Sequence, residues 1–495
     1  MLGGFKMNHI FTRKELDEKL SNVANKTLGE VDVNHVFNKA IDKPKITGIA
    51  GDVIEQSVLG YPADNRQEPD LIVDGLHTEL KTTGLRKPKK LGNSNNDKDF
   101  IAKEGVSITA VSPENITSRE FEDSHLWHKM EYMLFVFYHY NSYKVVPAYD
   151  YSMFEILGHH FYEFSDEDKE IIYNDWKIVR DRVEEIQINS PNPKEEYPSL
   201  TKLRSELMYF DLAPKKYPRF RLKKDVANVI IGEFFDKKLE KLQRKITSYS
   251  QLDQLLHNFT QLYEGKTLKE IATDLSVEIP GKINKNIAER IITKFFGSEK
   301  RKLRQIDLFS KIGLIPKTIV LNPRGGRTED MKFDKIDFED WFVEGEEYED
   351  SYLYDFFYNQ KFLFLIFKEP KKNSPLLENQ FVGFKRYSFT DDFMENDLKP
   401  YYDELKRLIV SNEIREETVL YTTGANKGQP IINPKGTVKT ENNLPKSKDY
   451  TVFTRGSGSN STKKPIELNG VKMYAQYFWI KGKWIVDELE PEQYI

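Results

Sequence analysis

The sequence predicts an α/β protein made of two copies of one fold. Its 495 residues exceed the length at which one hydrophobic core is usual. Short segments recur in the same order at an offset of roughly 237 residues. In each copy, the apolar patterns indicate helices, then two or more strands, a long amphipathic helix, and a basic strand-and-loop segment.

The composition is that of an ordinary globular protein, with 39% hydrophobic, 31% charged and 13% aromatic residues. There is no cysteine, which excludes disulfides, thiolate zinc sites and cysteine nucleophiles. No apolar run approaches the roughly 20 residues of a membrane span, and residues 1–6 lack a signal-peptide pattern. We therefore expect a cytoplasmic protein with no membrane association. Because the net charge is −4, any nucleic-acid surface must be a local patch.

The repeat is visible at four places along the chain. Residues 16–20 with 26–30, 45–60, 133–137 and 164–167 recur as residues 252–256 with 266–270, 282–297, 363–367 and 389–392. The third pair is typical of buried strands, and the fourth is an aromatic and acidic turn that precedes a helix. Four matches in one order are hard to obtain by chance. We therefore expect two domains, residues 1–240 and 241–495.

A hairpin in the first copy brings charged residues together. Two β-prone runs flank Asp74-Gly75, a strong turn signal. Because strand side chains alternate, Glu79 and Lys81 share one face of the second strand. Asp70 opens the first strand and can face the same place. Two carboxylates and a lysine are the groups that a Mg²⁺-assisted attack of water on a phosphodiester requires.

The acidic-x-Lys pattern by itself is common in such a charged chain, as Asp17 and Lys19 show. The prediction therefore depends on the hairpin and on Asp70. Glu55, beside an apolar stripe on an expected helix, is a fourth candidate for the site. The alternative for Glu55 is a solvated helix carboxylate.

Residues 45–60, Asp70 and residues 75–82 resemble the core of MutH, the mismatch-repair enzyme that nicks DNA at GATC. The length and duplication resemble its long relatives, the type II restriction endonucleases of the Sau-three-A kind. Those enzymes cut GATC and carry a second, catalytically silent MutH-like half. The resemblance implies two tandem restriction-endonuclease-like domains of the PD-(D/E)xK, MutH type, each a mixed sheet flanked by helices.

Position by position, the resemblance makes Asp70 and Glu79 ligands of Mg²⁺ and Lys81 the catalytic lysine. It makes Glu55 the helix carboxylate that completes the site. Asp74 stays open as an alternative first carboxylate. Asp70 is preferred because Asp74 is needed at the turn.

The second copy has lost these carboxylates. Asp307 matches Asp70, but Ile315 stands where Glu79 stood, and Ile292 or Thr293 replaces Glu55. Pro316 is expected to break the strand ladder. A site with one carboxylate holds Mg²⁺ poorly, so we expect this half to be a silent nuclease retained for binding.

Basic residues with interleaved aromatics indicate where DNA would be held. The densest run supplies the candidates Lys215, Lys216, Arg219, Arg221 and Lys223. The second copy offers Arg455, beside a Gly/Ser loop, and Lys481, which follows an aromatic run. A solvated face is the alternative for any single basic run.

These expectations combine into a Mg²⁺-dependent type II restriction endonuclease that cuts double-stranded DNA at GATC. The resemblance also implies a cognate DNA methyltransferase acting on the same site. The second half would bind a second site and act allosterically, or support self-association on DNA. A MutH-like repair nickase and a non-enzymatic DNA-binding regulator are the alternatives.

Overall fold

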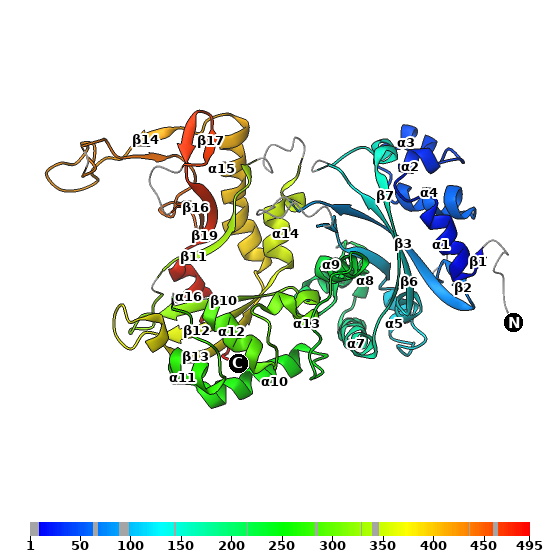
Figure 1. Cartoon of the computed structure of the whole chain (residues 1–495), viewed down its shortest axis with the longest axis horizontal. Coiled ribbons are helices and arrows are strands. Elements are labelled where there is room, and N and C mark those ends of the chain that lie inside the picture. The colour runs from blue at the N-terminus through cyan, green and yellow to red at the C-terminus, as the bar shows by residue number, and fades with distance from the viewer. Residues whose placement is uncertain are drawn as a thin grey trace. The chain divides into compact units, whose positions relative to one another are not determined.

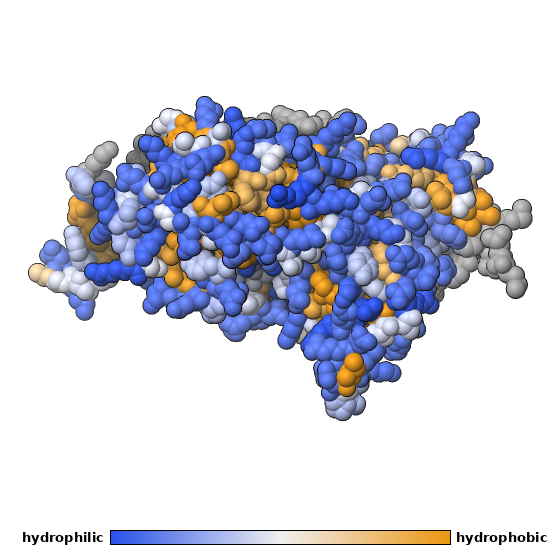
Figure 2. All heavy atoms as spheres, turned by 90° about the horizontal axis from the view of Figure 1, so that it is seen from below, coloured by the Kyte–Doolittle hydropathy of each residue, from blue (hydrophilic) through white to orange (hydrophobic). Residues whose placement is uncertain are grey.

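The structure, a computed structural model, describes residues 9–62, 68–88, 99–142, 145–214, 216–281, 283, 286–327, 329–338, 346–434, 436–458 and 464–495. The chain divides into two compact units (Figure 1). Unit 1 comprises Met1–Phe259 and Glu289–Ile315, and unit 2 comprises Thr260–Ala288 and Pro316–Ile495. Among the described residues, no helix is long and apolar enough to cross a membrane. The face seen in Figure 2 is mostly hydrophilic.

A mixed sheet forms the centre of unit 1, as predicted. Its strands are β1 (Ile10–Phe11), β2 (Leu71–Val73), β3 (Leu76–Arg86), β6 (Tyr132–His139) and β7 (Glu155–Glu163), in that order, with β4 (Ile101–Ala102) also on β3. β1 runs parallel to β2, and β3 runs parallel to β6. The β2–β3, β3–β4 and β6–β7 pairs are antiparallel. This order places β3, which carries the predicted acidic-x-Lys pattern, inside the sheet.

Helices cover both faces of this sheet. The amino-terminal helices are α1 (Arg13–Ser21), α2 (Leu28–Val31), α3 (Asn38–Asp42), α4 (Ile49–Val53) and the π-helical turn η2 (Ile54–Leu59). Their apolar residues share one core with Leu80 and Val136 of the sheet. On the other face, Phe234 of α9 (Lys224–Phe234) packs on Phe137, with ring centroids 5.0 Å apart. The other helices between β5 and α9 are α5 (Pro113–Ile116), α6 (His125–Met130), η3 (Ala148–Met153), α7 (Asp166–Asn189), α8 (Pro193–Glu196) and η4 (Tyr197–Ser205).

A second, antiparallel sheet completes unit 1, in the order β5 (Val106–Ala110), β9 (Arg219–Leu222), β8 (Phe210–Ala213). The predicted basic strand is therefore β9, the middle strand of this sheet. Unit 1 also includes most of α12 (Asn286–Phe295), η5 (Leu303–Gln305) and α13 (Asp307–Lys311).

Unit 2 has the same pair of sheets. One has the order β10 (Leu314–Leu321), β12 (Lys361–Lys368), β13 (Gln380–Tyr387), and the other β11 (Met331–Lys335), β19 (Ala475–Ile480), β16 (Val452–Ser457). Its helices are the end of α10 (Tyr249–Tyr263), then α11 (Leu268–Asp274), η7 (Tyr348–Asp350), α14 (Tyr352–Asn359), η8 (Leu376–Glu378), η9 (Phe393–Leu398), α15 (Lys399–Val410) and α16 (Gly482–Leu489). Two extra hairpins, β14 (Glu416–Thr418) with β15 (Thr440–Asn442) and β17 (Ile466–Leu468) with β18 (Val471–Met473), have no counterpart among the strands described in unit 1.

Hydrogen bonds confirm the predicted duplication in detail. Thr27 and Thr267 each form a capping box with the glutamate three residues later. The flanking backbone hydrogen bonds also correspond. In the first copy Asn25 N donates to Ile156 O (2.7 Å) and Leu28 N to Phe154 O (2.8 Å). In the second copy Gly265 N donates to Phe381 O (2.8 Å) and Leu268 N to Asn379 O (3.0 Å). β6–β7 and β12–β13 both contain a register shift next to a glycine. The two copies therefore share strand order and local geometry.

Two details of the second copy differ from expectation. Asp307, matched in sequence to Asp70, begins helix α13 rather than a strand. Its Oδ2 pairs with Lys311 Nζ at 3.0 Å, an i,i+4 contact that favours a helix. Pro316 lies inside β10 without breaking it. β10 is an end strand of the described sheet, where a residue without an N–H is tolerated.

Candidate active site

The β2–β3 hairpin positions the acidic residues. Asp74 and Gly75 have φ of 48° and 86°, the left-handed pair that a tight hairpin turn requires. The Asp74 carboxylate accepts a hydrogen bond from the backbone N–H of Arg13 at 3.2 Å, at the start of α1. Asp74 thus serves the turn. Asp70, at the other end of β2, lies beside Glu79.

Asp70 is held by backbone groups. Its Oδ2 accepts a hydrogen bond from Leu80 N at 3.0 Å, and its carbonyl oxygen lies 2.9 Å from His9 Nδ1. Burial first, and then the nearby Glu79 carboxylate, raise the pKa of Asp70 to about 6 against the opposing effect of Lys81 and Lys129. The effect of Glu79 on Asp70 indicates that the two carboxylates lie close together.

Glu79 is fully buried and is neutralised by two ammonium groups. Lys81 Nζ donates to Glu79 Oε1 at 2.5 Å. Lys129 Nζ donates to Oε1 at 3.0 Å and to Oε2 at 2.8 Å. A buried carboxylate without such partners would be costly. The two lysines therefore fix both the charge and the orientation of Glu79.

Lys129 is the site residue that the sequence reasoning missed. It lies in the last turn of α6, just before β6, and its side chain is 8% exposed. β6 runs parallel to β3 with Met133 beside Glu79, so the end of α6 is brought to the same place. The available signal was a lone lysine immediately before a predicted buried strand, which is weak by itself.

Lys81 carries a full positive charge in this setting. Burial acts to lower the pKa of Lys81, but Glu79 and Asp70 outweigh it, so the pKa lies above its ordinary value. Arg219 of β9 acts on Lys81 in the opposite direction. The basic strand β9 is thus electrostatically close to the predicted catalytic lysine.

Glu55 lies on η2, on the helical side of β3. A Cβ added to Gly51 would lie 3.9 Å from both Glu55 Oε1 and Thr82 Oγ1. The Glu55 carboxylate therefore lies beside β3 on the side of Thr82. Thr82 follows Lys81 directly in sequence, but its side chain points to the opposite face of the strand. The Thr82 hydroxyl is buried, and within the described parts of the chain it has no hydrogen-bond partner.

The donor set suits a small, hard cation. Asp70 and Glu79 offer carboxylate oxygens, and Mg²⁺ commonly takes one or two carboxylates and completes its shell with water and phosphate oxygens. In the described ranges no three Asp, Glu, His or Cys side chains are grouped tightly enough to hold a metal without such additional ligands. The residues present therefore fit Mg²⁺ shared with substrate rather than a closed structural site.

The described residues at the corresponding place in the second copy differ from this set. Lys317, matched to Lys81, donates to the carbonyl oxygen of Lys332 at 3.2 Å and lies over the Phe333 ring at 4.8 Å. Ile315 occupies the position of Glu79 on β10. The lysine is retained, but a carbonyl and a ring take the place of the carboxylate.

The predicted DNA-binding residues of unit 1 divide into two groups. Lys216 and Arg219 are exposed, and Lys216 lies over the Tyr217 ring at 5.3 Å. Arg221 forms a bidentate ion pair with Asp211, at 2.8 and 2.7 Å. Lys223 is buried and donates to the carbonyl oxygens of Arg204, Leu207 and Met208 at the end of η4. Lys215 falls outside the described residues.

Arg221 and Lys223 therefore differ from the prediction, because their cationic groups are engaged inside the fold. Lys223 caps a helix end instead of facing solvent. In unit 2, Arg455 is half-exposed and pairs with Asp330 at 2.8 Å. Lys481 is partly exposed and directly precedes α16.

Comparison with known proteins agrees with this geometry. The sequence model of the DNA mismatch repair enzyme MutH matches residues 59–175, a segment that contains Asp70, Glu79, Lys81 and Lys129. The type II restriction enzyme Sau3AI of Staphylococcus aureus is 24% identical over 481 residues, which cover 89% of this chain and 92% of that enzyme. The similarity therefore extends well beyond the MutH-like segment and through both copies.

Proposed function

Because the chain is a MutH-like protein related along most of its length to a type II restriction enzyme, we propose that it is a type II restriction endonuclease. It hydrolyses phosphodiester bonds in double-stranded DNA at GATC and depends on Mg²⁺. The observation that carries the proposal is the buried set formed by Asp70, Glu79, Lys81 and Lys129. GATC itself rests on the family resemblance.

Each residue has a distinct task in this reaction. Asp70 and Glu79 would hold the cation, which neutralises phosphate charge and assists the attacking water when bound. Water attacks phosphorus, one P–O bond breaks, and the departing oxygen takes up a proton. Because Lys81 is protonated at neutral pH, it is suited to orienting the water and stabilising negative charge on the phosphate.

The remaining residues position these groups or the DNA. Lys129 fixes Glu79 through two hydrogen bonds. Glu55 would support the site from η2, on the Thr82 side of β3. Lys216 and Arg219 contact backbone phosphates, and the proximity of Arg219 to Lys81 supports this placement.

The second copy is a silent nuclease that binds another GATC site. Its retained sheets and absent carboxylates support a binding role, either through allosteric activation or through self-association of two chains on DNA. On this proposal residues 1–240 contain the catalytic copy and residues 241–495 the silent copy. The protein acts in the cytoplasm, where a cognate methyltransferase protects the same sites.

A plasmid digest tests the proposal. Purified protein with Mg²⁺ should convert unmethylated plasmid into discrete fragments that end at GATC, and GATC methylation is compared in parallel. The fragments should be absent without metal and in Glu79→Gln. Lys81→Ala should lose activity on the order of 1,000-fold while it retains DNA binding.

Lys317→Ala, the matching lysine of the second copy, is the control and should cut normally. Nicked circles without linear fragments would favour the repair nickase. DNA binding without metal-dependent cleavage would favour the regulator.

A further inference from the structure

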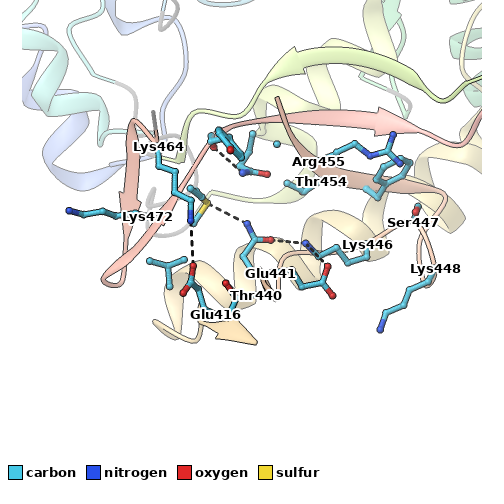
Figure 3. Close-up of a pocket in the computed structure, with 17 residues that line it drawn as sticks. Glu416, Thr440, Glu441, Lys446, Ser447, Lys448, Thr454, Arg455, Lys464 and Lys472 are labelled. Carbon is cyan, nitrogen blue, oxygen red and sulfur yellow. Dashed lines mark hydrogen bonds and ion pairs between the residues drawn. The ribbon is translucent and has the colours of Figure 1, made fainter. Parts of the chain in front are cut away.

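Unit 2 contains a pocket of 490 Å³ beside β16. Its walls come from the end of β16, from the β17–β18 hairpin, and from β15 with the segment after it (Figure 3). A volume of this size is typical of sites that bind small molecules or parts of larger ligands.

The walls of this pocket are what distinguishes the second copy from the first. In unit 1, residues 214–218 alone join β8 to β9, whereas residues 458–474 separate β16 from β19 and carry β17 and β18. The β14–β15 hairpin follows α15, and the part of unit 1 described after α7 has no such hairpin. The copy that lost its catalytic carboxylates is thus the copy with added elements around this pocket.

A basic residue lies at the corresponding place in the small sheet of each copy. In the first copy, Arg219 of β9 pairs with Ala213 of β8. In the second, Tyr477 of β19 pairs with Arg455 of β16, so the positive charge has moved to the partner strand. This end of the small sheet is basic in both copies.

The lining contains more cationic than anionic side chains, in a chain whose net charge is −4. Five lysine or arginine side chains and two carboxylates line it: Lys446, Lys448, Arg455, Lys464, Lys472, Glu416 and Glu441. Three carboxylates outside the lining, Asp330, Asp449 and Glu467, pair with Arg455, Lys448 and Lys472. The four lysine pairs are 3.6 Å or longer, and surface pairs of this kind are weak, so the ammonium groups stay available to an anion.

Two of these lysines have weak partners and keep free donors. Lys464 is 3.6 Å from Glu416, and Lys446 is 3.9 Å from Glu441 while donating to Asn442 Oδ1 at 2.8 Å. Figure 3 marks the contacts of Lys464 and Lys446 with dashed lines. Each ammonium group has three donors, so donors remain for a ligand. Burial also lowers the pKa of Lys446, and a bound anion would counter that effect.

Arg455 limits the kind of ligand that fits. Its guanidinium lies 4.9 Å from the centroids of both Phe453 and Trp479 and pairs with Asp330 at 2.8 Å. The Phe453 face is therefore covered by the guanidinium and offers little room for a stacked base. Recognition by charge at phosphate groups is favoured over recognition of a nucleobase.

We propose that this pocket binds backbone phosphates of DNA and is the surface through which the second copy holds its DNA site. The inference rests on the proposed function and adds the location and chemistry of the second binding site. DNA and a free nucleotide share the phosphate ester that this pocket would bind. DNA is favoured because the added hairpins lie beside β16 and β19, and β19 corresponds to the basic strand β9 of the first copy.

The experiment measures binding stoichiometry on the full chain. A Lys81→Ala parent prevents cleavage, and a labelled GATC duplex is titrated by fluorescence anisotropy at several salt concentrations. The parent should bind two duplexes per chain. Lys446→Ala/Lys464→Ala should keep one site and weaken the other at least about tenfold, with a salt slope for that site lower by roughly 2.

Lys371→Ala/Lys372→Ala, which removes two exposed lysines after β12 of the same unit, is the control and should behave as the parent. Thermal melting verifies folding. If the alanine pair melts early, Lys446→Gln/Lys464→Gln, which retains a donor for Asn442, replaces it.

Unchanged stoichiometry and salt slope in the lysine variants would overturn the inference, as would displacement of the second duplex by mononucleotide at a similar phosphate concentration. Cleavage of a single-site duplex by the wild type separates the two proposals. If the wild type cleaves DNA but the lysine variants keep normal binding at the second site, only this inference is wrong. If the wild type does not cleave DNA but binds the second duplex, and the lysine variants weaken that binding, the nuclease assignment is wrong.

Discussion

Lys129 differs from the other site residues because it holds a ligand-type carboxylate from outside the hairpin. Lys129→Met would leave buried Glu79 with one ammonium partner. Loss of that positive charge also raises the pKa of Asp70, which Lys129 acts to lower. We expect kcat/KM to fall roughly 10- to 100-fold, as for lost supports of metal ligands, and the rising limb of the pH–rate profile to move to higher pH.

The profile is the decisive measurement, because a purely structural defect lowers activity at every pH alike. Lys169→Met is a matched control. Lys169 lies over the nearby Trp127 ring at 4.7 Å but contacts no carboxylate of the site in the described contacts. An unshifted profile in Lys129→Met would contradict the role.

Asp70 gives a prediction for stability. Its pKa of about 6 exceeds its ordinary value of 3.8, so between these pH values the folded protein keeps a proton that the unfolded chain has lost. Stability from this group is present below about pH 4 and is lost as pH rises through about 6. In EDTA at pH 8, Asp70→Asn should raise the free energy of unfolding by about 1–3 kcal/mol.

The same variant should be less responsive to metal. Mg²⁺ binds the folded state and should raise Tm in the wild type and in Asp74→Asn, the turn residue. If Mg²⁺ raised the Tm of Asp70→Asn as much as that of the wild type, Asp70 would not be a metal ligand. Urea unfolding at pH 4 and pH 8 measures the stability difference.

At this scale the sequence predicted what depends on local periodicity. Glu79 and Lys81 share a face because strand side chains alternate, and Asp70 follows from the hairpin. Lys129 depends on parallel pairing across a long sequence separation, which no local pattern reveals. Lys223 was placed on a DNA surface because a basic run cannot distinguish an exposed lysine from one that caps a helix end.

Among the elements, α13 is joined to α7 by a buried ion cluster. Lys311 Nζ lies 2.8 Å from Asp168 Oδ1 and 3.0 Å from Asp307 Oδ2, and Tyr209 also donates to Asp168. Lys311→Met leaves the buried Asp168 and the partly buried Asp307 without their cation. We expect a loss of about 3–5 kcal/mol in the free energy of unfolding, measured by urea denaturation.

A double-mutant cycle tests the cause. Lys311→Met/Asp168→Asn should recover part of the loss, because the unpaired charge is removed with its partner. Lys294→Met, which removes a partly exposed lysine of α12 paired with the exposed Glu299, should cost less than about 1 kcal/mol. Additive effects at Lys311 and Asp168 would contradict the coupling.

The repeat was predictable at the level of elements because helix caps and buried strands leave strong sequence patterns. The helix that begins at Asp307 was not predictable, because the same Asp-Leu pair precedes a strand at Asp70 and begins a helix at Asp307. Tertiary contacts with Asp168 decide between them. The two added hairpins were not predicted, because short exposed strands lack apolar alternation.

For the whole molecule, unit 1 includes residues from beyond the predicted boundary at residue 240. Phe309 is buried against Phe296, with ring centroids 4.8 Å apart, and Lys311 neutralises Asp168. A fragment of residues 1–240 should therefore be poorly folded, whereas residues 1–315 should retain a cooperative thermal transition. Circular dichroism melting of the two fragments checks this, and equal melting would show that residues 289–315 are dispensable.

The inclusion of residues 289–315 in unit 1 has a consequence for the cell that makes the protein. If a stop codon or a protease removed the second copy at the repeat boundary, the first copy would also lose part of its own core. Such a fragment would be poorly folded and degraded, so it would not cut the chromosome of the cell. The shared core thus makes damage to the gene fail safely.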